Sequence, residues 1–121
     1  MRFFSILTLS LFLLAKPLHA ECFGPLCHEM HRLSSDLLAL TNGGFPTPSP
    51  TYDPIQDIRD MEDAATKAQK LVPAGADEKA YQKMFDDLLT ELKAYENDPK
   101  NKAHIDAIKK IRNAGHEQFK Q

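Results

Sequence analysis

The sequence predicts an all-α protein that folds as an antiparallel four-helix bundle with up-down-up-down topology. Four segments repeat apolar residues with the helical period of about 3.6 residues, and none shows the sustained alternation of a β-strand. Each segment has one apolar face, which has to be buried against its neighbours. The links between them are short or of medium length, as in bundles whose consecutive helices are antiparallel. With 121 residues, the chain is long enough for one such domain and no more.

Residues 1–20 are predicted to be a secretory signal peptide, which leaves residues 21–121 as the bundle domain. Arg2 gives a positive start, the apolar stretch after it is too short to span a bilayer with margin, and Ala20 is a small residue suited to cleavage. The alternative is an uncleaved amphiphilic anchor, which the break at Lys16-Pro17 disfavours. No later hydrophobic run reaches membrane length, so we expect a periplasmic protein with no stable membrane association.

The only two cysteines of the sequence, Cys22 and Cys27, are predicted to form a disulfide, because an exported protein enters an oxidising compartment. A thiolate metal site would need further soft ligands, and none lie beside this pair. A loop this short adds only modestly to stability. We therefore expect the bridge to staple the chain at the entry to the first helix.

The first two helices are separated by the longest connection. The first is expected to end at Asn42-Gly43-Gly44, because glycine tolerates the left-handed geometry that often closes a helix. The stretch 45–54 contains four prolines and is predicted to be a loop. The second helix starts at about Pro54 and ends before Pro73. The apolar faces carry Leu26, Met30, Leu33, Leu37 and Leu40 in the first helix, and Ile58, Met61, Ala65, Ala68 and Val72 in the second.

The last two helices are joined by the shortest predicted link. Asp77 is expected to cap the N-terminus of the third helix. In Asn97-Asp98-Pro99 we expect the third helix to end and the fourth to begin, with Asp98 as N-cap and Pro99 as the first residue of the fourth helix. The inward faces carry Tyr81, Met84, Phe85, Leu88, Leu92 and Tyr95 in the third helix, and Ile105, Ile108, Arg112, Gly115, His116 and Phe119 in the fourth.

Met30 and His116 form the candidate site. In this topology the start of the first helix and the end of the fourth lie at the same end of the bundle, and both residues lie on inward faces at nearly equal depth. A thioether and an imidazole that face each other across an apolar slot can bind the two faces of a haem iron. The ordinary alternatives are a methionine that packs in the core and a core histidine whose hydrogen bonds are satisfied.

The final segment, Ile111-Arg-Asn-Ala-Gly-His-Glu-Gln-Phe-Lys120, resembles the closing helix of the cytochrome b562 family. At the other end, Met30-x-x-Leu33-x-x-x-Leu37 has the spacing of that family's first helix. The resemblance covers residues 26–120. It implies an exported electron-transfer haemoprotein that binds one non-covalent haem b, with Met30 and His116 as the axial ligands of the iron.

The same resemblance assigns roles to the residues around the iron. Tyr81 and Phe85 stand where the family places aromatic rings against the porphyrin. Arg112, one turn before His116, is suited to hold a haem propionate by charge-assisted hydrogen bonds, or else is a solvated arginine at the bundle edge. Gly115 departs from the pattern, because the best-known member of the family has an aromatic ring there. No Cys-x-x-Cys-His occurs, which excludes covalent c-type attachment.

The sequence favours an electron carrier over an enzyme or a nucleic-acid-binding protein. The formal charge of −2 is of the wrong sign for nucleic acid. We find no nucleophile–base pair, no inward pair of carboxylates and no glycine loop for phosphate, so we expect no catalysis. We expect a monomer that exchanges electrons with redox partner proteins. The alternatives are a haem-less bundle that serves as a periplasmic binding or stress-response protein, and a copper carrier that uses His28, Met30 and His31.

Overall fold

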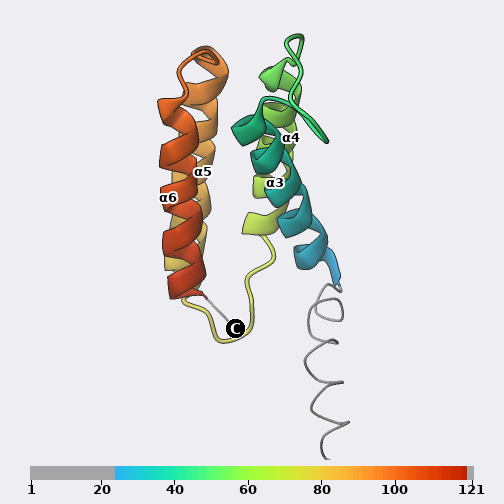
Figure 1. Ribbon diagram of the computed structural model, residues 1–121. Coiled ribbons are helices and arrows are strands. Elements are labelled where there is room, and N and C mark those ends of the chain that lie inside the picture. Colours follow the sequence, from blue (N-terminus) through green and yellow to red (C-terminus); the bar gives the residue numbers. More distant parts are fainter. Residues whose placement is uncertain (1–23, 120–121) are drawn as a thin grey trace, which may run out of the picture.

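The structure is a computed structural model that describes residues 24–119, and it confirms an all-α four-helix bundle (Figure 1). The described residues contain no β-strand. The predicted signal peptide and Cys22 lie outside them. The four helices are α3 (Gly24–Asn42), α4 (Pro54–Gln69), α5 (Glu78–Asn97) and α6 (Ala103–Gln118).

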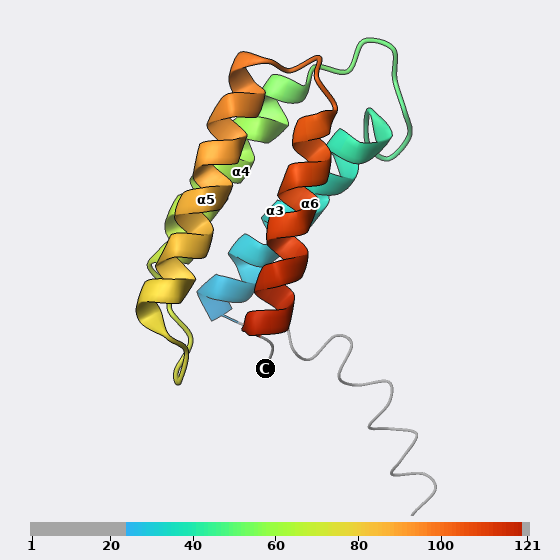
Figure 2. The same cartoon turned by 90° about the vertical axis from the view of Figure 1, so that its left-hand side faces the viewer.

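Consecutive helices run in opposite directions and pack side by side, α3 on α4, α4 on α5 and α5 on α6. The first and last helices contact each other at few places, so the bundle is open between α3 and α6. Figure 2 shows that the start of α3, the end of α6 and the loop between α4 and α5 lie at the same end of the bundle. The topology therefore brings the two ends of the described chain together, as the sequence predicts.

The core consists of the apolar faces predicted from the helical period. Met61, Phe85, Leu92 and Ile108 are among the largest fully buried side chains. Along α4 the buried face combines Ile58 and Met61 with small residues that have no exposed surface, and small residues leave room for a neighbouring helix. These small residues are Ala64, Ala65 and Ala68.

Several helix ends form for the reasons that the sequence indicates. After α3, Gly43 and Gly44 adopt positive φ angles of 78° and 144°. Their amides donate to the carbonyl of Ala39 at 2.8 and 2.9 Å, which satisfies an acceptor that the helix leaves open. The Asp53 carboxylate caps α4, and the Asp77 carboxylate caps α5 by accepting from the amide of Ala80 at 3.2 Å.

The predicted start of the fourth helix is wrong. α6 begins at Ala103 rather than at Pro99, and the amide of Ala103 donates to the side chain of Asn101 at 3.0 Å. Asp98 closes α5 instead, because its amide donates to the carbonyl of Tyr95 at 3.0 Å. Its own carbonyl accepts from the amide of Asn101, also at 3.0 Å, so the segment after α5 forms a turn before the next helix begins.

The end of α4 also differs, since the helix stops at Gln69 and not near Val72. The Tyr81 hydroxyl, on α5, donates to the carbonyls of Ala68 and Leu71 at 2.8 and 3.3 Å. The Ala68 carbonyl also accepts from the amide of Leu71 at 2.9 Å, so the hydroxyl is a second donor at the end of α4. A side chain from the next helix thus caps this one, and the buried Tyr81 ring is locked in place.

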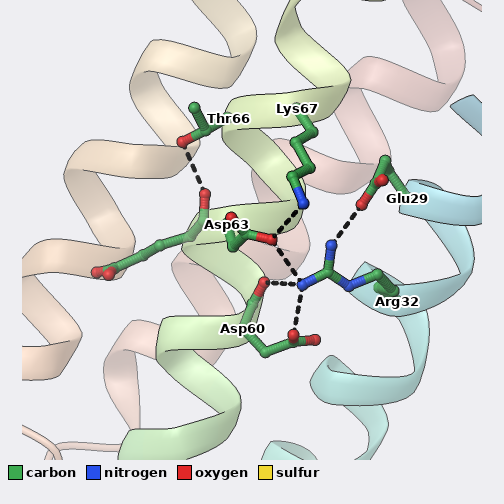
Figure 3. A network of polar contacts seen from close by, with 7 residues as sticks. Glu29, Arg32, Asp60, Asp63, Thr66 and Lys67 are labelled. Carbon is green, nitrogen blue, oxygen red and sulfur yellow. Dashed lines mark hydrogen bonds and ion pairs between the residues drawn. The ribbon is translucent and has the colours of Figure 1, made fainter. Parts of the chain in front are cut away.

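A charged network ties α3 to α4 on the side away from the core (Figure 3). The Arg32 guanidinium donates to Glu29 on its own helix at 2.7 Å, and to Asp60 and Asp63 of α4 at 2.5 and 2.9 Å. Lys67 adds a second cation at 3.2 Å from Asp63. Because one guanidinium bridges carboxylates of two helices, the network fixes the position of α3 along α4.

Beside this network, Asp36 of α3 lies against Asp60 of α4, and the two carboxyl groups share a hydrogen bond. Burial, together with that bond, raises the pKa of Asp36 from 3.8 to about 8. The hydrogen bonds from Asp36 and from Arg32 lower the pKa of Asp60. The pair is therefore stable when Asp36 carries the proton and Asp60 carries the charge.

A larger side chain in place of one of the buried alanines of α4 should destabilise the bundle. Replacing Ala65 by leucine adds atoms at a position with no exposed surface, and overpacking of a core costs about 1–3 kcal/mol. The measurement is the free energy of unfolding in urea, followed by circular dichroism. The control is Ala94→Leu on the exposed face of α5, which should change the free energy of unfolding by less than about 0.5 kcal/mol. Equal changes in the free energy of unfolding at the two positions would contradict tight packing around Ala65.

Asp36 should make the protein less stable as the pH rises. Its pKa is about 8 in the folded state and 3.8 when unperturbed, so between these values the native protein holds a proton that the unfolded chain releases. The free energy of unfolding should therefore fall from about pH 4 to about pH 8, and Asp36→Asn should flatten this dependence because the amide still donates to Asp60.

Urea unfolding at pH 5 and pH 8 measures the effect, with Asp106→Asn, at an exposed carboxylate of α6, as the control. An unchanged slope in the Asp36 variant would show that this carboxyl group is not protonated in the folded protein.

Candidate functional site

The open side of the bundle holds a cavity of about 720 Å³ between α3 and α6. All four helices contribute to its lining, and most of the lining side chains are apolar. It lies toward the end of the bundle where α3 begins and α6 ends. Its existence follows from the few contacts between α3 and α6, because the apolar faces of these two helices do not close against each other.

The structure brings Met30 and His116 to this same cavity. Met30 lies in the second turn of α3, half-buried and packed against the core. His116 lies in the last turn of α6 and is exposed, so it stands at the rim rather than in the interior that the sequence predicts. Among the described residues, no hydrogen bond or ion pair holds the His116 ring. The cavity thus offers a thioether on one flanking helix and an orientable imidazole on the other.

Tyr81 and Phe85 form an aromatic wall of the cavity. Both are buried on α5, and their ring centroids are 5.0 Å apart in an edge-to-face arrangement. Phe119, just after α6, adds a third ring 5.4 Å from Tyr81, again edge to face. Because the Tyr81 hydroxyl is engaged by α4 carbonyls, its ring presents an apolar surface to the cavity. This wall suits a flat, apolar guest.

Arg112 lines the cavity one turn before His116 and is exposed. Its Nε donates to the side chain of the neighbouring Asn113 at 3.1 Å. No carboxylate of the described residues pairs with it. A cation therefore stands at the rim of an apolar cavity, where it can meet an anionic group of a bound molecule.

Met84 and Gly115 form a contact that the sequence does not reveal. A Cβ atom added at Gly115 would lie 2.3 Å from Met84 Sδ, and the next nearest atoms would also belong to Met84. The thioether of α5 therefore sits on the bare backbone of α6, immediately before His116. In the sequence, the only signal for such a contact is a glycine inside a helical pattern. Which residue packs against that glycine depends on how α5 and α6 are aligned.

The other histidines of the described residues lie away from the cavity lining. His28 and His31 are exposed and do not line it, so they are not placed beside Met30 as ligands. His104, at the far end of α6, has its Nδ1 at 2.6 Å from the Glu91 carboxylate and stacks on Tyr95 at a centroid distance of 5.3 Å. The hydrogen bond to Glu91 raises the pKa of His104.

Cys27 also lines the cavity and is disulfide-bonded, whereas its predicted partner Cys22 lies outside the described residues. Within residues 24–119, no group of three or more histidine, cysteine, aspartate or glutamate side chains is arranged to hold a metal ion. None of the helices described is both long and apolar enough to cross a membrane. Comparisons with protein-family models, curated proteins and solved structures found no match to the chain.

Proposed function

We propose that the chain is an exported electron-transfer protein that binds one non-covalent haem b in the cavity between α3 and α6. The observation that carries the proposal is the placement of Met30 and His116 on the two helices that flank one apolar cavity. Its volume of about 720 Å³ falls within the range of roughly 300–1,000 Å³ that is usual for cofactor sites. The resemblance of the final helix to the cytochrome b562 family supports the same assignment.

The residues present fit the chemistry of a haem. Met30 would hold the haem iron through its thioether and His116 through its imidazole. The rings of Tyr81 and Phe85 provide an apolar surface for the macrocycle, and Arg112 at the rim suits a propionate carboxylate. When bound, haem supplies one-electron redox chemistry.

The chain's own residues would decide which chemistry is allowed. Met30 and His116 would both hold the iron, which would favour electron transfer over the binding of oxygen. The buried rings of Tyr81 and Phe85 exclude water from one wall of the cavity. Since His116 and Arg112 are exposed on α6, the rim is accessible to redox partner proteins. We propose the periplasm as the compartment on the strength of residues 1–20.

A haem titration tests the ligand assignment. The purified chain, reconstituted with haem and reduced, should show the sharp α and β bands of a low-spin iron with two protein ligands. Met30→Ala and His116→Ala should each abolish these bands by removing one ligand. His31→Ala is the matched control, because this histidine is on the same helix as Met30 but does not line the cavity. Bands that persist without Met30 and without His116 would refute the assignment.

Bound haem should also raise the melting temperature. A ligand that binds only the folded protein stabilises it by about 4 kcal/mol at a thousand times its dissociation constant. Thermal unfolding of the haem-free and haem-bound protein measures this stabilisation, and equal melting temperatures would count against binding in this cavity.

A haem-less binding or stress-response protein of the same fold is the second candidate. The observation that favours it is the exposed His116 ring, because metal-bound histidines are usually oriented by a hydrogen bond to their second nitrogen. Copper carriage through His28, Met30 and His31 lacks such support, since both histidines lie off the cavity. Failure of the wild-type chain to take up haem in the titration would leave the haem-less candidate.

A further inference from the structure

The contact between Met84 and Gly115 sits in the wall of the cavity. Both residues line it, Gly115 is buried, and Met84 is half-buried. Built on the Gly115 backbone, a Cβ atom would be 2.3 Å from Sδ, 3.5 Å from Cε and 3.7 Å from Cγ of Met84. The whole end of the methionine side chain thus rests in the notch that the missing side chain leaves on α6.

The notch matters because of what lies beside it. Real Cβ contacts are never as close as 2.3 Å, so a side chain at position 115 would force the thioether out. Met84 lines the cavity, so the free space next to its side chain is the cavity itself. A displaced methionine would therefore occupy volume that a guest needs, next to His116.

We propose that the notch at Gly115 determines what the cavity admits: it holds the Met84 thioether against α6 and so keeps the cavity wide enough for a planar macrocycle. This inference rests on the proposed binding of haem and adds a specificity-determining pair to it. Glycine lowers the stability of a helix interior, so helix propensity does not account for the glycine at position 115. The methionine also suits this place, because its thioether is flexible and packs well against flat rings.

The test separates cavity width from iron ligation by using two probes, haem and metal-free protoporphyrin IX. Protoporphyrin IX has the same flat ring but no iron, so Met30 and His116 cannot ligate it. Gly115→Ala should weaken the binding of both probes by about tenfold or more, as expected for overpacking. In contrast, His116→Ala should weaken haem far more than protoporphyrin IX. Affinities follow from absorbance for haem and from fluorescence for protoporphyrin IX.

Gly115→Ala also distinguishes the proposal from a general loss of structure. Alanine favours the helix more than glycine does, and the atom it meets is the end of a flexible side chain. We therefore expect the melting temperature of the haem-free variant to stay equal to that of the wild type or to rise, while the affinity for both probes falls. A variant that melts lower and keeps wild-type affinity would overturn the proposal.

A second variant tests the direction of the displacement. In Met84→Ala/Gly115→Ala the side chain that would enter the cavity is absent, so probe binding should recover by at least a factor of about three over Gly115→Ala. Leu89→Ala/Gly115→Ala is the matched control. Leu89 is a half-buried residue of the same helix as Met84 but does not line the cavity, so this pair should show no recovery. Equal recovery in both pairs would contradict the notch.

The remaining outcomes are also decisive. If the wild type binds protoporphyrin IX but shows no low-spin haem spectrum, the proposed electron-transfer function fails and the notch is still tested by protoporphyrin IX alone. If Gly115→Ala binds both probes as tightly as the wild type, the notch proposal fails and haem binding stands. Wild-type protein that binds neither probe would overturn both.

Discussion

The attachment of α3 to α4 is the constraint on which the rest of the structure depends. Because α3 contacts α6 at few places, its position is set almost entirely by α4. Two features make that attachment specific. The buried alanines of α4 leave room for a neighbouring helix, and Arg32 joins α3 to the carboxylates of Asp60 and Asp63. Met30 lies on this helix, so the same attachment sets how far its sulfur lies from α6.

The helical period predicted most of the core, but Ala39 and Ala64 are also buried, and Arg112 and His116 are exposed although the period places them inward. Leu37, Leu40, Phe85 and Leu92 are buried where the period places them, and the glycines after Asn42 close α3. The ends of the helices were harder to predict from the sequence. Asp98 followed by Pro99 is a common start signal, yet Asp98 caps the preceding helix and α6 begins later. The decisive hydrogen bonds there join residues of a turn, and periodicity carries no information about turns.

The candidate site was only partly readable from the sequence. Met30, Arg112, His116, Tyr81 and Phe85 all line the same cavity, as expected for residues at inward positions near the same end of a bundle. The exposure of His116 depends on how far α3 and α6 stand apart, which no local pattern reports. The contact of Met84 with Gly115 was also hidden, because it depends on the alignment of two helices along each other.

The loose contact between α3 and α6 has a kinetic consequence. A guest can reach the cavity from the side of the bundle, between two helices that share few contacts, without the loss of any helical hydrogen bond. Entry should then require only the rotation of side chains at the rim, which takes nanoseconds or less for exposed groups, and no global unfolding. A bundle closed on all four sides would trap its guest for as long as it stayed folded, whereas this one permits exchange.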